Sequence, residues 1–104
     1  MPHFYKRSAS RLGDADVEHC SVPFRMMAST DVFVNGRGWS RMGDYNTPHL
    51  LPCSCPPCCC IHLAPIAFGS TTVWVNGRMA GRLGDPIGGC TFVGMGSSNV
   101  FAGG

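Results

Sequence analysis

The tetrapeptide Arg-x-Gly-Asp occurs three times in this chain, at residues 11–14, 41–44 and 82–85. Five residues after each Asp stands a side chain that can bind a metal ion. These side chains are His19, His49 and Cys90. If the three copies belong to equivalent structural units, the three ligands meet around a pseudo-threefold axis. The sequence therefore predicts a small repeat protein whose units share one metal site.

The repeat extends ahead of the second and third tetrapeptides. Residues 29–36 read Ser-Thr-Asp-Val-Phe-Val-Asn-Gly, and residues 70–77 read Ser-Thr-Thr-Val-Trp-Val-Asn-Gly. In both, alternating β-formers lead into Asn-Gly, which tolerates the positive φ angles of a type I′ turn. Each unit is therefore expected to be a strand, a tight turn, a returning strand and a Gly-Asp loop.

The first unit lacks its leading strand, and the missing half stands at the other end of the chain. Residues 97–103, Ser-Ser-Asn-Val-Phe-Ala-Gly, match residues 70–76 position by position. We therefore expect a closed ring in which one unit is split across the termini. Val100 and Phe101 should then pair with the strand that leads into Arg11, shielding otherwise open strand edges.

The aromatic residues Phe33, Trp74 and Phe101 occupy equivalent positions of these three strands. Large aromatic side chains commonly dominate a small core. We therefore expect them to pack together around the pseudo-axis rather than to form a binding face.

Length and composition indicate one all-β domain. A chain of 104 residues has room for a single domain, with repeat cores expected at about residues 10–28, 29–69 and 70–104. Fourteen Gly and eight Pro are scattered through every segment, and no apolar stripe of helical period persists. The expected fold is a small domain of three pseudo-threefold β-hairpin repeats, which a metal or disulfide would help to stabilise.

The longest segment between two tetrapeptides contains a further potential ligand, His62. Three His and one Cys make a closed tetrahedral set for zinc, so we expect one structural Zn²⁺ per chain. Its expected ligands are His19, His49, His62 and Cys90. Because such a site has no position left for water, and Glu18 is the only Glu, the chain is not expected to be an enzyme.

Five of the seven cysteines stand in the run 53–60, Cys-Ser-Cys-Pro-Pro-Cys-Cys-Cys. One of these thiols could replace His62 as the fourth ligand. The run could also pack within its loop, form disulfides or bind a second metal ion. Cys20, which is adjacent to His19, is expected to pack as a small apolar side chain.

Charge and targeting features exclude several classes of partner. Eight Lys and Arg against six Asp and Glu give a net charge of +2, with no basic run that would indicate nucleic-acid binding. The N-terminus has no apolar segment typical of a signal peptide, and no apolar stretch approaches the roughly 20 residues of a membrane helix. The protein is therefore expected to be made in the cytoplasm, and no small-molecule substrate is expected.

Units built around Val-Phe/Trp-Val-Asn-Gly and Arg-x-Gly-Asp, with His or Cys downstream, resemble the PAAR-repeat domain family, named for its Pro-Ala-Ala-Arg motif. The resemblance covers the chain from about Ser10 to the C-terminus. It implies a pointed cone of short β-hairpins, with zinc bound near the vertex by three His and one Cys. The chain departs from the family in its extra Cys-rich run and in the tetrapeptide, which is degraded to Gly38-Trp-Ser-Arg41 and Ala80-Gly-Arg82.

Proteins of that family sit on the trimeric β-helical spike of contractile injection machines, which are phage tails and type VI secretion systems. The resemblance implies a structural spike tip, with one copy capping one trimer and touching the target membrane transiently. With no extension domain, this chain would be a bare tip, carried on a virion tail or ejected on a secretion spike, and its length favours a phage tail. The alternative is a stand-alone zinc-binding interaction module, which the near-neutral charge and the lack of a recognition helix disfavour.

Overall fold

The computed structural model describes residues 6–18, 20–52 and 59–104, and the regular elements in these ranges are all β-strands. The all-β class expected from the sequence is therefore confirmed. None of the described residues forms a helix that is long and apolar enough to cross a membrane. The strands are β1 (Arg7–Ser8), β2 (Phe33–Val34), β3 (Arg37–Gly38), β4 (His49–Pro52), β5 (Cys59–His62), β6 (Trp74–Val75), β7 (Arg78–Met79) and β8 (Phe101–Ala102).

Both Asn-Gly dipeptides close the hairpins that the sequence predicts, β2–β3 and β6–β7. Asn35 and Gly36 have φ angles of 53° and 80°, and Asn76 and Gly77 have φ angles of 54° and 78°. Two consecutive positive φ angles define a type I′ turn, whose twist matches that of the flanking strands. The turn chemistry alone therefore fixes these two hairpins.

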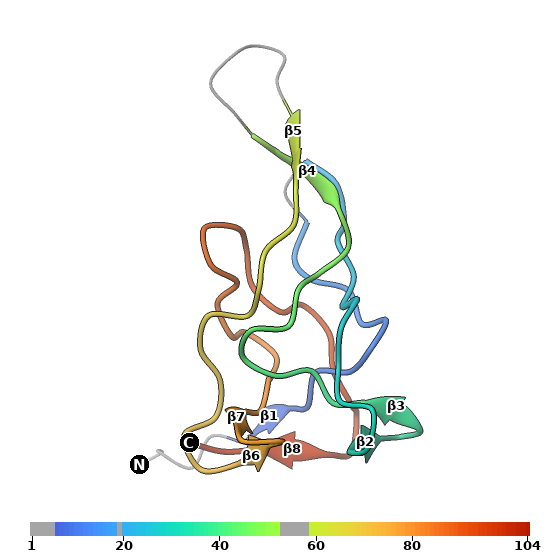
Figure 1. Cartoon of the computed structure of the whole chain (residues 1–104), viewed down its shortest axis with the longest axis vertical. Coiled ribbons are helices and arrows are strands. Elements are labelled where there is room, and N and C mark those ends of the chain that lie inside the picture. The colour runs from blue at the N-terminus through green and yellow to red at the C-terminus, as the bar shows by residue number, and fades with distance from the viewer. Residues whose placement is uncertain (1–5, 19, 53–58) are drawn as a thin grey trace.

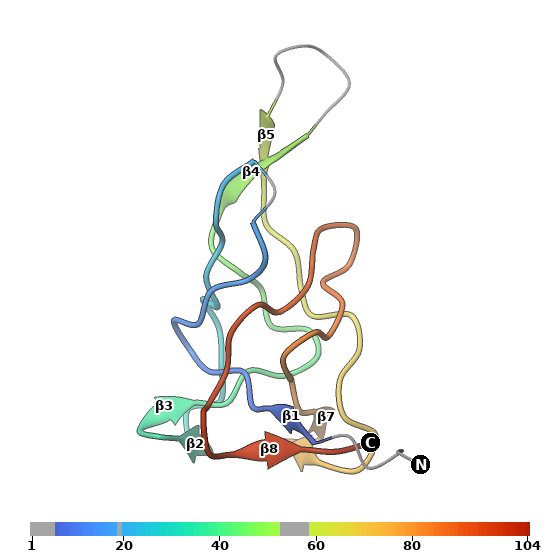
Figure 2. The ribbon, with the colours of Figure 1, turned by 180° about the vertical axis from the view of Figure 1, so that it is seen from behind.

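The third small sheet joins the two ends of the chain, because β1 pairs with β8 in antiparallel orientation. Ser8 faces Phe101, and the amide of Ala9 donates to the carbonyl oxygen of Val100 at 2.9 Å. The predicted pairing of Val100 and Phe101 with the strand that leads into Arg11 is therefore confirmed. The C-terminal strand lies beside the N-terminal one in both views of the fold (Figures 1 and 2).

A closed ring of backbone hydrogen bonds links the residues that immediately precede the three Arg-x-Gly-Asp tetrapeptides. The amide of Ser10 donates to Gly81 at 3.0 Å, that of Gly81 to Ser40 at 2.8 Å, and that of Ser40 to Ser10 at 2.9 Å. All three segments are buried here, where an unpaired backbone group would be costly. In this cyclic pattern, each segment donates a backbone hydrogen bond to one neighbouring segment and accepts one from the other.

Each Arg-x-Gly-Asp forms the same loop, in which the Arg donates from its backbone amide and its guanidinium to the Asp. A second arginine, from a neighbouring strand or hairpin, also reaches each carboxylate. These pairs are Arg37–Asp14 at 3.0 Å, Arg78–Asp44 at 3.4 Å and Arg7–Asp85 at 2.9 Å. The Asp therefore does more than close a turn, because its ion pair with the second arginine connects the loop to a neighbouring strand.

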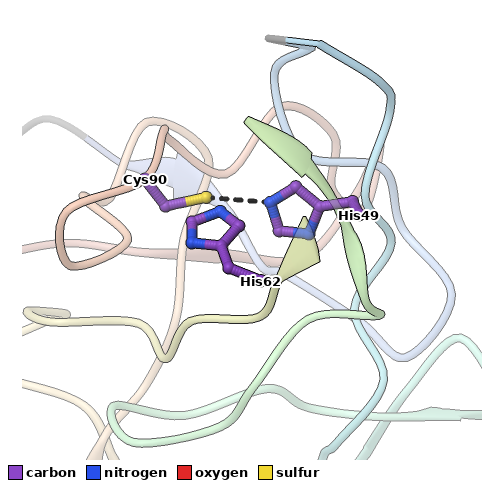
Figure 3. Close-up of side chains that lie close together, drawn as sticks. All are labelled: His49, His62 and Cys90. Carbon is purple, nitrogen blue, oxygen red and sulfur yellow. Dashed lines mark hydrogen bonds between the residues drawn. The ribbon is translucent and has the colours of Figure 1, made fainter. Parts of the chain in front are cut away.

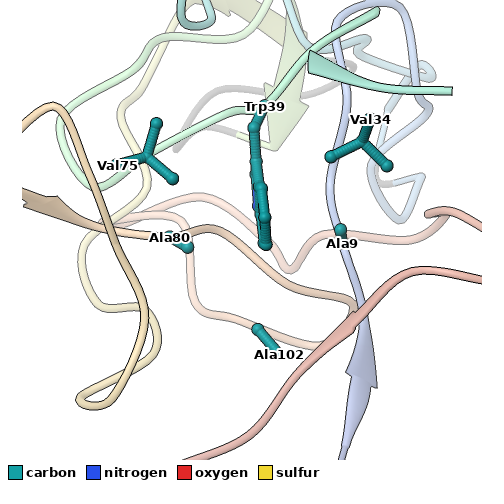
Figure 4. Close-up of a cluster of buried hydrophobic side chains, with 6 residues drawn as sticks. All are labelled: Ala9, Val34, Trp39, Val75, Ala80 and Ala102. Carbon is teal, nitrogen blue, oxygen red and sulfur yellow. The ribbon is translucent and has the colours of Figure 1, made fainter. Parts of the chain in front are cut away.

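Two small apolar clusters lie inside the described part of the molecule. The first surrounds Trp39, which occupies the same position relative to its tetrapeptide as Ala9 and Ala80 (Figure 4). One large and two small side chains fill a centre that is too narrow for three large ones. The first cluster contains Ala9, Val34, Trp39, Val75, Ala80 and Ala102, and the second contains Ala64, Ile66, Ile87 and Val93.

The prediction that Phe33, Trp74 and Phe101 pack around the pseudo-axis is wrong. Their exposed fractions are 60%, 56% and 47%. Successive side chains of a strand point to opposite faces, and the next residue of each strand faces inward instead. These buried neighbours are Val34, Val75 and Ala102.

The four sheets lie at two ends of a body that measures 42 × 33 × 23 Å. Figure 1 shows β1–β8, β2–β3 and β6–β7 together at one end of the long axis, which we call the base. The β4–β5 hairpin lies at the opposite end, which we call the tip. The side chains discussed below as metal ligands are carried by this hairpin and by one loop beside it.

Candidate metal centre

Two imidazoles come from directly opposed positions of the β4–β5 hairpin. His49 is the first residue of β4 and pairs with His62, the last residue of β5. Side chains of directly paired residues in an antiparallel sheet lie on the same face. The two rings accordingly meet edge to face, with their centroids 4.4 Å apart and their planes at 63°.

A thiol from a different part of the chain joins the two imidazoles. Cys90 lies in a tight loop in which its amide donates to the carbonyl oxygen of Ile87 at 2.9 Å. Its Sγ is 3.1 Å from Nε2 of His49 (Figure 3). His49 is buried, whereas His62 and Cys90 are half-buried, so the group lies at the edge of the protein interior.

The spacing of these three side chains suits a metal ion. One possible ligand atom from each of the three lies within 4.8 Å of the other two. Donor atoms on one tetrahedral zinc ion are roughly 3.3–3.8 Å apart, as follows from bond lengths of about 2.0–2.3 Å. Imidazole nitrogen and thiolate sulfur are also the donors that zinc prefers. Among the side chains that the structure describes, in residues 6–18, 20–50 and 61–104, no other group of three or more His, Cys, Asp or Glu has this spacing.

The hydrogen bond of His49 prepares one of its ring nitrogens for a metal. Nδ1 lies 2.7 Å from the carbonyl oxygen of Thr47. Because a carbonyl oxygen only accepts, Nδ1 carries the hydrogen and Nε2 keeps its lone pair. Nε2 is the nitrogen that faces Cys90, so the ring is oriented for metal binding through Nε2.

Burial raises the pKa of the Cys90 thiol, and the nearby Asp16 carboxylate raises it further, against an opposing hydrogen bond from Asn46. A catalytic Cys–His pair requires the opposite shift, because the thiolate is the nucleophile. A bound cation would supply the missing positive charge and deprotonate the thiol. Without a bound cation, the surroundings of Cys90 therefore do not favour the thiolate that a nucleophile requires.

A buried polar cluster, formed by Asp16, Arg25 and Asn46, extends from Cys90 into the molecule. Asp16 and Arg25 form an ion pair at 2.8 Å, and both side chains are fully buried. Asn46 donates from Nδ2 to Asp16 at 3.1 Å and to Cys90 Sγ at 3.9 Å. Burial raises the pKa of Asp16, and the charge of Arg25 opposes this shift. Sequence reasoning missed this cluster, although Asp16 and Asn46 stand at the same position after their tetrapeptides.

Three of the four expected ligands come together, namely His49, His62 and Cys90. His19 lies outside the described residues, but the chain on either side of it is placed. The amide of Val17 donates to the carbonyl oxygen of Phe92 at 2.8 Å, next to the loop of Cys90. The hydroxyl of Ser21 accepts from the amide of Leu50 in β4 at 2.9 Å.

Cys20 is disulfide-bonded, so the expectation that it packs as a small apolar side chain is wrong. The expectations for the 53–60 run concern residues whose side chains lie outside the described part of the chain. Packing, disulfides, a second metal and replacement of His62 therefore all remain predictions for that run.

A scan against models of known protein families finds no match to this chain, and a search of curated proteins finds none. The candidate site and the arrangement of the strands are therefore the features that bear on the function of this protein.

Proposed function

We propose that this protein is the structural tip of a contractile injection spike, stiffened by one zinc ion at the end opposite its three base sheets. The observation that carries the proposal is the convergence of His49, His62 and Cys90 at that end. The three base sheets and the tip hairpin fit the three-unit cone that the PAAR resemblance implies. One unit of this cone would be split across the paired termini.

The fourth zinc ligand in this proposal is His19. The hydrogen bonds of Val17 and Ser21 hold the chain on both sides of residue 19 beside the loop of Cys90 and beside β4. Four protein ligands would close the coordination sphere, as in structural rather than catalytic zinc sites. A cysteine of the 53–60 run is the alternative source of a ligand.

Zinc would stabilise the part of the molecule that has the least apolar core. Neither apolar cluster of the described residues contains a residue of β4 or β5. Apparent binding energies of structural zinc are about 10–16 kcal/mol, and they become folding energy when the unfolded chain has no site. A metal crosslink between β4, β5 and the loop of Cys90 would therefore keep the tip rigid under load.

The base would dock onto the blunt end of a trimeric β-helical spike. Phe33, Trp74 and Phe101 are exposed at equivalent positions of the three base sheets. A trimer presents each of its surfaces three times around one axis, so a single chain with three similar two-stranded sheets can contact all three subunits. Exposed aromatic side chains and open strand edges suit such an interface.

The stoichiometry of the complex tests this function. When the chain is mixed with the trimeric spike of the same genome, light scattering should give the mass of one chain per spike trimer. No complex, or one chain per spike subunit, would contradict the tip role. Either result would favour the alternative, a stand-alone zinc-binding interaction module.

A further inference from the structure

Asn46 connects the candidate metal centre to the polar interior. Its side chain is completely buried. Its Oδ1 accepts a hydrogen bond from the amide of Ala64 at 2.9 Å. Its Nδ2 donates to the Asp16 carboxylate at 3.1 Å and also to Cys90 Sγ, which lies 3.9 Å away. The oxygen and the nitrogen of this side-chain amide thus both have hydrogen-bond partners, and one partner, Cys90, is an expected metal ligand.

The orientation of this amide follows from the chemistry of its partners. The backbone amide of Ala64 can only donate, so it requires the oxygen of Asn46. The carboxylate of Asp16 is held in an ion pair with Arg25 at 2.8 Å, and it requires the nitrogen. The remaining N–H of Asn46 is therefore directed by the fold itself, and it is available to the sulfur of Cys90.

Packing alone does not require a polar residue at this position. The equivalent position after the third tetrapeptide is Ile87, which is buried in the second apolar cluster. An apolar side chain therefore fits the same place in the fold. The amide at residue 46 is therefore explained by its contacts with Asp16 and Cys90 rather than by packing.

We propose that Asn46 is a positioning residue for the metal, which holds the sulfur of Cys90 in place by an N–H···S hydrogen bond. This inference rests on the proposed metal centre. A donor to a metal-bound thiolate withdraws negative charge from the sulfur and fixes its direction. Contacts of this kind typically change metal affinity by about 10–100-fold.

Cobalt-substituted protein tests the inference, because the thiolate-to-cobalt absorption band reports the electron density on the sulfur. Asn46→Leu removes the donor and resembles the Ile87 environment. We expect this variant to bind one cobalt ion, with its band at longer wavelength and with release to excess chelator about 10-fold faster than from wild type. An unchanged band and an unchanged release rate would overturn the inference.

Asp16→Asn is the matched control in the same buried cluster. It removes the charge that pairs with Arg25, but an amide oxygen can still accept from Asn46. We expect lower stability and the wild-type release rate, and no shift of the band to longer wavelength, because loss of the negative charge of Asp16 near the sulfur can only lower its electron density. If Asp16→Asn and Asn46→Leu shift the band equally, Asn46 has only a structural role and the inference is wrong.

A measurement on the wild-type protein covers the case in which Asn46→Leu does not fold. Exchange of zinc for cadmium changes the charge on the bound sulfur, so the side-chain amide proton resonance of Asn46 should move. The side-chain amide of Asn35, which donates to Asn99 in the base, should not. An unmoved Asn46 resonance overturns the inference alone, whereas a wild-type protein that takes up no metal overturns the proposed centre as well.

Discussion

Each of three buried carboxylates forms ion pairs with two arginines at the same time. These carboxylates belong to Asp14, Asp44 and Asp85. One arginine belongs to the same loop, and the other comes from a neighbouring strand or hairpin. A buried charge is costly unless it is paired and fully hydrogen-bonded. Here each carboxylate also accepts from a backbone amide, so the repeated Asp serves as a crosslink as well as a turn residue.

Single ligand substitutions should separate the residues that bind zinc from those that only lie nearby. We expect one zinc per wild-type chain after dialysis, and almost none in Cys90→Ser, His49→Ala or His19→Ala, because each removes a ligand. Elemental analysis measures this, and His3→Ala, which changes the one His that lies outside the repeats, is the control variant. Full zinc content in both Cys90→Ser and His49→Ala would refute the site, whereas retention in His62→Ala alone would indicate a cysteine of the 53–60 run.

At the scale of the elements, the three base sheets differ in the interactions that stabilise them. Hairpins β2–β3 and β6–β7 form through their own Asn-Gly turns. The β1–β8 sheet has no turn, since its strands come from the two ends of the chain. Its stability therefore depends on the buried contacts of Ala9 and Ala102 in the first apolar cluster and on the ion pair between Arg7 and Asp85.

Deletion of residues 97–104 should unfold the domain. It removes β8, the buried hydroxyl of Ser97 that caps the turn before it, and the carbonyl of Gly103 that accepts from Arg82. Thermal unfolding followed by circular dichroism should show no cooperative transition. Removal of Gly104 alone is the control, because it costs one exposed hydrogen bond with Thr71. A truncated protein with the wild-type Tm would mean that the C-terminus is a dispensable tail.

On the scale of the whole molecule, the candidate metal ligands and the exposed aromatic side chains of the three base sheets lie at opposite ends. The candidate metal ligands lie together toward the tip, whereas Phe33, Trp74 and Phe101 are exposed residues of the three base sheets. This separation fits a body that binds one partner through its base and leaves its tip free. The proposed metal binding and the proposed docking to a spike can therefore be disrupted independently.

Substitution of Trp74 and Phe101 by Ser should weaken binding to the spike trimer at least 10-fold, since truncation of an aromatic hot-spot residue such as Trp at a protein interface costs about 2 kcal/mol or more. Zinc content and Tm should stay near wild type, because both side chains are about half exposed. Titration calorimetry measures the affinity. Ile61→Ser, which changes the exposed residue of β5 at the tip, should bind the spike normally. Equal weakening by Ile61→Ser would argue against docking through the base.

The sequence by itself determined the features that depend on neighbouring residues or on exact repetition. The Asn-Gly turns follow from the backbone freedom of two adjacent residues, and the pairing of the termini follows from the match between residues 97–103 and 70–76. His49 and Cys90, which stand at the same offset after their tetrapeptides, do come together, as expected for equivalent positions of a repeat.

Only the tertiary structure decided which face of each strand turns inward. Two-residue strands carry no alternating pattern long enough to indicate a buried face. The sequence therefore did not show that Trp39 is in the core whereas Phe33 and Trp74 are exposed. The contact from Asn46 to Cys90, the ion pair of Asp16 with Arg25 and the disulfide of Cys20 were also not apparent from the sequence. These contacts depend on how the loops of different units pack against one another, and such packing is set by the closed ring rather than by any local stretch of chain.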